Sequence, residues 1–93
     1  MPFAAVTNVK LVGREPAEAQ QFLNETLIPR LKAMPGFQTA RFMRSEDGAT
    51  GIGSVIFDTE GNARAALDAM TANRRPEAPP VDRTAVYEVV LEV

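Results

Sequence analysis

The glycine-containing run EDGATGIGSVIFD, residues 46–58, constrains the fold more than any other stretch of the chain. A phosphate-binding loop would lead from a strand into a helix, so that the helix N-terminus faces the anion. Here the glycines lead instead into Ser-Val-Ile-Phe at 54–57, a run of residues that favour strands. Asp47–Gly48 favours a two-residue turn in which both central residues have positive φ. The run therefore predicts a hairpin that joins strands at 37–46 and 49–58, and not a nucleotide-binding loop.

Periodicity outside the hairpin predicts two more strands and two helices. Apolar residues alternate at both ends of the chain, as in half-buried strands. Between them, apolar residues recur every three or four positions, as in amphipathic helices. Pro29 interrupts the first helical pattern, and its missing N–H predicts a kink near Glu25–Thr26. The expected elements are strands at 3–12 and 83–93 and helices at 15–34 and 60–74.

The element order is β-α-β-β-α-β within one domain, residues 1–93. This order predicts an α+β, ferredoxin-like fold with a four-stranded antiparallel sheet and both helices on one face. The opposite face would be polar in a monomer. However, valines remain on that face whichever of the two alternating sets of strand residues points toward the helices. We therefore expect two sheets to pair as a homodimer, forming an α/β barrel; the alternative is scattered surface valines. The valines considered are Val6, Val12, Val86 and Val90.

Composition excludes several function classes. The 93 residues contain no cysteine and no histidine, which removes thiolate chemistry and the commonest metal ligand. The net charge of −2 offers no basic excess for binding nucleic acid. No apolar run approaches the ~20 residues that span a membrane, and the N-terminus does not resemble a signal peptide. We therefore expect a cytoplasmic protein with no metal, no cofactor, no nucleic acid partner and no membrane partner.

Two stretches carry a resemblance to a known family. TLIPRLKAMPGFQTARF places Pro-Gly-Phe between the first helix and the second strand, and GSVIFDTEGNARAAL joins the third strand to an alanine-rich helix. In these stretches and in element order, the chain resembles the dimeric α/β-barrel superfamily, and within it the antibiotic-biosynthesis-monooxygenase-like domains. The resemblance implies a homodimer. The superfamily includes cofactor-independent monooxygenases of polyketide quinones, haem-degrading enzymes and proteins of no known role.

The family's functional residues are matched only in part. Haem-degrading members use an Asn on the first strand, a Trp at the end of the third and a His on the second helix. Asn8 fits the first position, but Phe57 ends the third strand and the chain has no His, so a haem-degrading role is not expected. Quinone-oxidising members use Asn, Trp, Tyr and Arg around the substrate. Asn8 and Tyr87 have two of these residue types, and Arg41 and Arg44 the third, but Trp is absent.

A ligand pocket is expected between the sheet and the helices. Gly51 and Gly53 lack side chains on one side of the third strand, where a close approach by another group is expected. If that side faces the helices, a void opens beside Asn8; the alternative is that core side chains fill it. Candidate substrate-binding residues are Asn8, Phe22, Leu23, Leu27, Phe57, Met70 and Tyr87.

Two functions follow from this reading. The first is a binding or assembly module for a small apolar molecule. The alternative is a cofactor-independent monooxygenase acting on an aromatic or quinone-type molecule. No catalytic residue is assigned.

Overall fold

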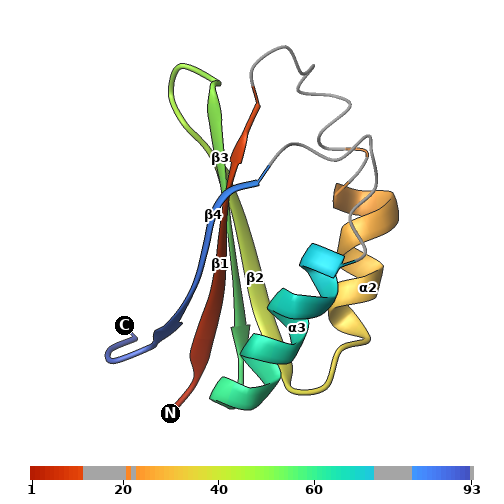
Figure 1. Ribbon diagram of the computed structural model, residues 1–93, viewed down its shortest axis with the longest axis vertical. Helices are drawn as coiled ribbons and strands as arrows, with labels where there is room; N and C mark the ends of the chain where they lie inside the picture. The colour runs from red at the N-terminus through yellow and green to blue at the C-terminus, as the bar shows by residue number, and fades with distance from the viewer. Residues whose placement is uncertain (12–20, 22, 73–80, 93) are drawn as a thin grey trace.

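A computed structural model describes residues 1–11, 21, 23–72 and 81–92 of the chain. Four antiparallel strands form one sheet in the order β2-β3-β1-β4, and the helices lie on one face of it (Figure 1). This arrangement confirms the ferredoxin-like α+β prediction. The elements are β1 (Phe3–Lys10), a π-helical turn η1 (Leu23–Leu27), α2 (Ile28–Lys32), β2 (Phe37–Arg44), β3 (Thr50–Phe57), α3 (Glu60–Ala72) and β4 (Val81–Glu88).

The hairpin between β2 and β3 is confirmed, but its predicted turn type is wrong. Only Gly48 has positive φ in the loop, at 76°, and no other residue type adopts positive φ in the described part of the chain. Ser45 N–H donates to Thr50 O at 2.8 Å, and Gly48 N–H donates to Ser45 O at 2.9 Å. The connection is therefore a four-residue loop built on a turn that ends in a left-handed glycine. Asp47 keeps negative φ, and its carboxylate accepts hydrogen bonds within the loop.

The first helix departs from α geometry where Pro29 predicts an irregularity. η1 covers Glu25 and Thr26, and α2 follows with Pro29 in its first turn. Proline cannot donate to the carbonyl four residues back, and its ring would clash with that carbonyl. A π-helical turn is the kind of local widening that removes such a clash. The first part of the predicted helix, residues 15–20, lies outside the described residues.

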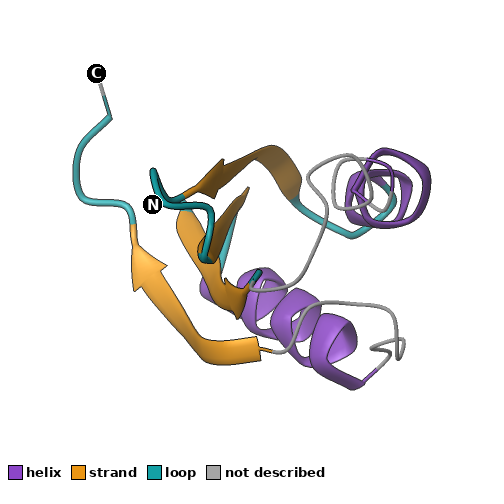
Figure 2. Ribbon diagram, turned by 90° about the horizontal axis from the view of Figure 1, so that it is seen from above, coloured by secondary structure: helices purple, strands orange, loops and turns teal. Residues whose placement is uncertain are grey.

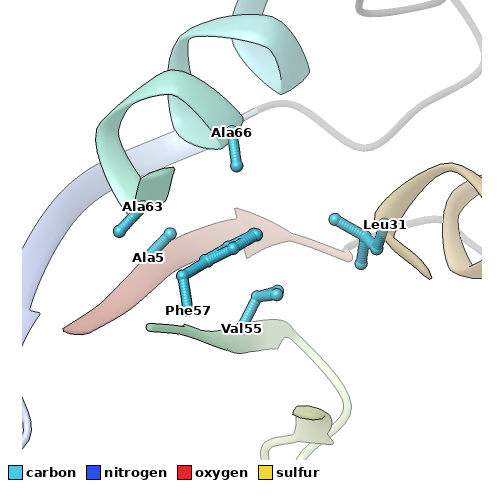
Figure 3. Packing of buried hydrophobic residues seen from close by; sticks show 6 residues of the cluster. All are labelled: Ala5, Leu31, Val55, Phe57, Ala63 and Ala66. Carbon is cyan, nitrogen blue, oxygen red and sulfur yellow. The ribbon is translucent and has the colours of Figure 1, made fainter. Parts of the chain in front are cut away.

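Phe57 is the centre of the hydrophobic core. Figure 3 shows its ring between the sheet residues Ala5 and Val55 and the α3 residues Ala63 and Ala66. The two small α3 side chains let this helix lie close against β1, β3 and β4. Leu31 reaches the same cluster from α2, and Phe37 meets Phe57 edge to face with ring centroids 6.2 Å apart. The fully buried members are Ala5, Leu31, Phe57 and Ala63.

β4 differs from its predicted bounds of 83–93. It begins at Val81 and ends at Glu88. Val89 N–H still donates to Pro2 O at 2.9 Å, but Val90 and Leu91 extend beyond the sheet. The alternation of apolar residues to position 93 predicts a longer strand, but the pairing of β4 with β1 ends at Glu88, which lies opposite Phe3.

Candidate functional site

The strand register assigns each sheet residue to one of two faces. Residues directly opposite each other on antiparallel strands share a face. Ala5 lies opposite both Val55 and Val86, and all three pack toward the helices, which defines the helix-covered face. The residues between them define the open face: Ala4, Val6, Asn8 and Lys10 on β1, Ile52, Ser54 and Ile56 on β3, Thr39, Arg41 and Met43 on β2, and Arg83, Ala85 and Tyr87 on β4.

The helix-covered face has a fully buried centre with partly buried apolar residues around it. Phe57 and Ala63 are fully buried. Apolar side chains from the helices and from β2 pack against this core but are only partly buried. We refer to four of these partly buried residues as the inner apolar site: Leu27, Phe42, Leu67 and Met70. Exposed apolar surface between two layers is what an apolar ligand would bury.

Gly51 and Gly53 do face the helices, but the space that they leave is filled. A Cβ atom on Gly53 would lie 2.9 Å from Cε1 of Phe42, and one on Gly51 would lie 3.0 Å from Cδ1 of Leu11. The expected close approach is therefore confirmed, and the expected void above these glycines is wrong. The ring of Phe42 crosses the strand and covers Gly53, so Phe42 forms part of the floor of the inner apolar site.

Gly53→Ala is expected to destabilise the protein by about 1–2 kcal/mol, because overpacking costs more than the reduced chain entropy gains. The new methyl group would displace the Phe42 ring, which lies within 3.0 Å of its position. Gly61→Ala is the matched control, since nothing lies within 4 Å of a Cβ there and the site is in α3. That change should be neutral or stabilising by up to ~1 kcal/mol. Urea unfolding would measure both; equal effects would contradict the account of Phe42.

The open face carries the two polar candidates. Asn8 lies opposite Ile52 and Arg83, and Tyr87 lies opposite Ala4. Four residues separate the β1 positions that face Arg83 and Tyr87, so Asn8 and Tyr87 are about 13 Å apart along the sheet. Tyr87 is exposed and Asn8 is partly buried.

The sheet separates the predicted pocket residues into two groups. Leu27, Phe57 and Met70 belong to the helix-covered face, and they pack in or against one core cluster. Asn8 and Tyr87 belong to the open face, so a single pocket beside Asn8 lined by Leu27, Phe57 and Met70 does not form within one chain. Phe57 is fully buried and offers no surface to a ligand. Phe22 and the side chain of Leu23 lie outside the described residues.

The arginines considered with these residues are also divided. Arg41 lies opposite Ser54 on the open face. Arg44 lies opposite Gly51 and so belongs to the other face of the sheet. Both side chains are exposed. Asn8, Tyr87 and Arg41 therefore share a face without surrounding one cavity.

The open face carries apolar residues among polar ones, but they are not all the residues that the sequence indicates. Val6 lies on it, but Val86 packs against the core and Val90 lies beyond β4. Val12 lies outside the described residues. The apolar residues that do cover it are Val6, Ile52, Ile56, Met43 and Tyr87, of which Ile52, Met43 and Tyr87 are exposed.

A shallow depression at the hairpin loop is lined by Ser45, Glu46 and Asp47. Asp47 Oδ1 accepts hydrogen bonds from Ser45 Oγ at 2.7 Å and from Ala49 N–H at 3.0 Å. The Ser45 hydroxyl, and after it the Ala49 N–H, lower the pKa of the Asp47 carboxyl below its ordinary value because both stabilise the charged form. The carboxylate therefore stabilises the loop itself.

Asp47 is expected to make part of the free energy of unfolding depend on pH in the acidic range. Its folded pKa is below its unfolded pKa of about 3.9, so the contribution is present above that pH and is lost as the pH falls through the folded pKa. Urea midpoints between about pH 6 and 2 should decline less for Asp47→Asn than for the wild type. Glu46→Gln removes a neighbouring carboxylate of the same loop and should follow the wild type. Identical profiles for wild type and Asp47→Asn would contradict this assignment.

Neither a metal cluster nor a membrane span is found in the described part of the chain. No group of three or more acidic residues is gathered as metal ligands there. None of the described helices has the length and hydropathy needed to cross a bilayer.

Comparison with solved structures identifies the architecture. A monooxygenase of Streptomyces coelicolor, from the gene ActVA-Orf6 and solved with nanaomycin D, aligns over 98% of this chain and 89% of its own, with a TM-score of 0.66 and 18% identity. A Bordetella bronchiseptica protein described as an antibiotic biosynthesis monooxygenase aligns over 97% and 98%, with a TM-score of 0.68 and 14% identity. The fold is that of the antibiotic-biosynthesis-monooxygenase-like proteins.

A third solved structure has the same fold. A protein of Shewanella loihica described as a monooxygenase aligns over 98% of this chain and 96% of its own, with a TM-score of 0.65 and 21% identity. No family model matches the sequence, and no curated protein matches it either. The likeness to the monooxygenase-like proteins is therefore one of fold.

Phe42 and Leu67 are site residues that the sequence analysis missed. A signal for Phe42 was present, since counting outward from Asp47–Gly48 pairs Phe42 with Gly53, as the structure does. A bulky aromatic opposite a glycine is a recurring cross-strand arrangement. Leu67 is on the apolar stripe of α3, one turn beyond Ala63. The sequence does not distinguish the two positions, but in the structure Ala63 is fully buried and Leu67 is only partly buried.

Proposed function

We propose that this chain is a homodimeric protein that binds a flat, apolar small molecule at the inner apolar site. The observation that carries the proposal is the incomplete cover over Leu27, Phe42, Leu67 and Met70, which lie between the helices and the sheet. A ligand there would bury apolar surface that the isolated chain leaves in contact with water. The described residues include no buried polar or charged side chain, so selectivity rests on shape and on apolar contact.

An aromatic ligand suits the site best. Phe42 presents a ring on the sheet side and Met70 presents a thioether on the helix side, and both favour contact with a planar π-system. The Streptomyces coelicolor monooxygenase of the same fold was solved with nanaomycin D as its ligand, which supports a small-molecule ligand for this fold. A quinone-type aromatic is therefore the proposed ligand.

The dimer is proposed from the open face. Ile52, Met43 and Tyr87 place exposed apolar side chains on three different strands of one sheet surface. Exposed apolar side chains gathered on one face are typical of an interface. A second copy of the same sheet offers a surface that is complementary by symmetry, because a two-fold interface joins identical patches.

Monooxygenation of the bound molecule is a second candidate function. It is favoured by the compared structures, three of which are described as monooxygenases. This reaction would use no resident cofactor. The chain has no Trp or His that could take part in it. The binding proposal stands independently of this step.

A titration with 2-methyl-1,4-naphthoquinone tests the binding proposal. Met70→Gln keeps side-chain length but places a polar amide at the site, and it is expected to weaken binding about tenfold. Met43→Gln makes the same change on the open face and should bind as the wild type does, with sedimentation confirming its oligomeric state. Absence of wild-type binding, or an equal loss in both variants, would overturn the proposal.

A further inference from the structure

The hairpin loop contains an aspartate followed by a glycine, the pair at which an aspartate isomerises most easily. Asp47 is the one aspartate of the sequence that precedes a glycine. Because Gly48 has no side chain, its backbone nitrogen meets little hindrance when it approaches the preceding carboxyl group. Asp47 is exposed, and Figure 1 shows the loop at the end of the sheet away from the two termini. Water therefore has access to the reacting groups.

The isomerisation needs no cofactor and no second protein. The Gly48 nitrogen attacks Cγ of Asp47, so that an N–Cγ bond forms and a Cγ–O bond breaks. Water leaves, made from the hydroxyl of the protonated carboxyl group and the amide hydrogen, and a cyclic succinimide remains. Water then opens this ring. Cleavage of the N–Cγ bond restores aspartate, whereas cleavage at the α-carbonyl gives isoaspartate of the same mass, with the main chain running through the former side chain.

Three hydrogen bonds within the loop oppose this reaction. Asp47 Oδ1 accepts from Ser45 Oγ at 2.7 Å and from Ala49 N–H at 3.0 Å. Both bonds stabilise the charged carboxylate, which has no hydroxyl to lose as water, and the Ser45 hydroxyl contributes most to the lowered pKa of Asp47. The third bond holds the nucleophile, since Gly48 N–H donates to Ser45 O at 2.9 Å. Attack on Cγ would require Gly48 to give up that bond.

We propose that Asp47–Gly48 is an isoaspartate site that the folded hairpin keeps inactive, with Ser45 as the protecting residue. Ser45 acts on both reacting groups, because its hydroxyl binds the carboxylate and its carbonyl binds the Gly48 nitrogen. Thr50 N–H donates to Ser45 Oγ at 3.0 Å and so holds the hydroxyl in place. Isoaspartate would lengthen the main chain of the loop by one carbon atom, so the modified hairpin is expected to be less stable.

Peptide mapping of aged protein tests the protection. Wild-type protein would be incubated at about pH 5, where unfolded aspartates are partly protonated, both folded and in urea. Chromatography with electron-transfer fragmentation separates the two isomers at position 47, although their masses are equal. The folded chain is expected to isomerise about tenfold more slowly than the unfolded chain. Equal rates would overturn the protection.

Variants of Ser45 test which residue protects the site. Ser45→Ala removes the hydroxyl and should raise the rate in folded protein about tenfold, whereas Ser45→Thr keeps a hydroxyl and should isomerise as the wild type does. Gly53→Ala is the matched control, because it destabilises the fold through Phe42 and leaves the loop unchanged. An unchanged rate in Ser45→Ala, or an equal rise in Gly53→Ala, would overturn the role of Ser45.

Discussion

Phe57→Ala is expected to lower the free energy of unfolding by about 3–5 kcal/mol. The ring is fully buried between two strands and α3, and the residues around it are mostly alanines that cannot move in to fill the cavity. A domain of this size has a total stability of roughly 5–15 kcal/mol, so the variant would be close to unfolding at 37 °C. Urea denaturation followed by circular dichroism measures the loss.

Phe3→Ala is the control for this change. Phe3 lies directly opposite Phe57 on the same face of the sheet, but it is only partly buried at the edge of the cluster. Its removal should cost clearly less, because water already reaches the site. Equal losses for the two variants would contradict the placement of Phe57 at the centre of the core.

Ile52→Glu is expected to convert the dimer to a folded monomer. Ile52 is 38% exposed in the single chain, so a glutamate there remains solvated and the fold is kept. In a dimer each new carboxylate would leave water for the interface, and this desolvation costs several kcal/mol. Because each 1.4 kcal/mol changes a dissociation constant tenfold, the dissociation constant of the dimer should rise more than about a hundredfold. Sedimentation equilibrium at micromolar concentration measures this change.

Ala65→Glu adds the same charge on the exposed side of α3 and should leave the dimer intact. Circular dichroism of both variants establishes that they are folded. If Ile52→Glu remains a dimer, or if Ala65→Glu also dissociates, the open face is not the dimer interface.

Local sequence signals predicted the elements because those signals act over a few residues. Pro35–Gly36 ends the first helix and Gly36 adopts φ of 78°, while Asp47–Gly48 produces the hairpin. Thr59 caps α3 as its residue type favours, with Thr59 Oγ1 accepting from Asn62 N–H at 3.1 Å. Each of these features depends on neighbours within five residues.

The face of each strand was harder to predict because it depends on contacts between distant parts of the chain. Asn8 lies between Thr7 and Val9, and the sequence does not show whether Asn8 or Thr7 points toward the helices. The register decides: Asn8 pairs with Ile52 and Arg83 on the open face. The length of β4 was overestimated for a similar reason, since alternation predicts a strand but not whether a partner strand extends far enough.

Methyl chemical-shift mapping of the naphthoquinone titration tests the central claim, that the helix-covered face binds the ligand and the open face does not. With methyl-labelled protein, the largest shifts are expected at Leu27, Leu67 and Met70, which surround the inner apolar site. Met43 and Ile52 on the open face should shift little, because the sheet separates them from the ligand. The largest shifts at Met43 and Ile52, with Leu67 and Met70 unchanged, would contradict the account.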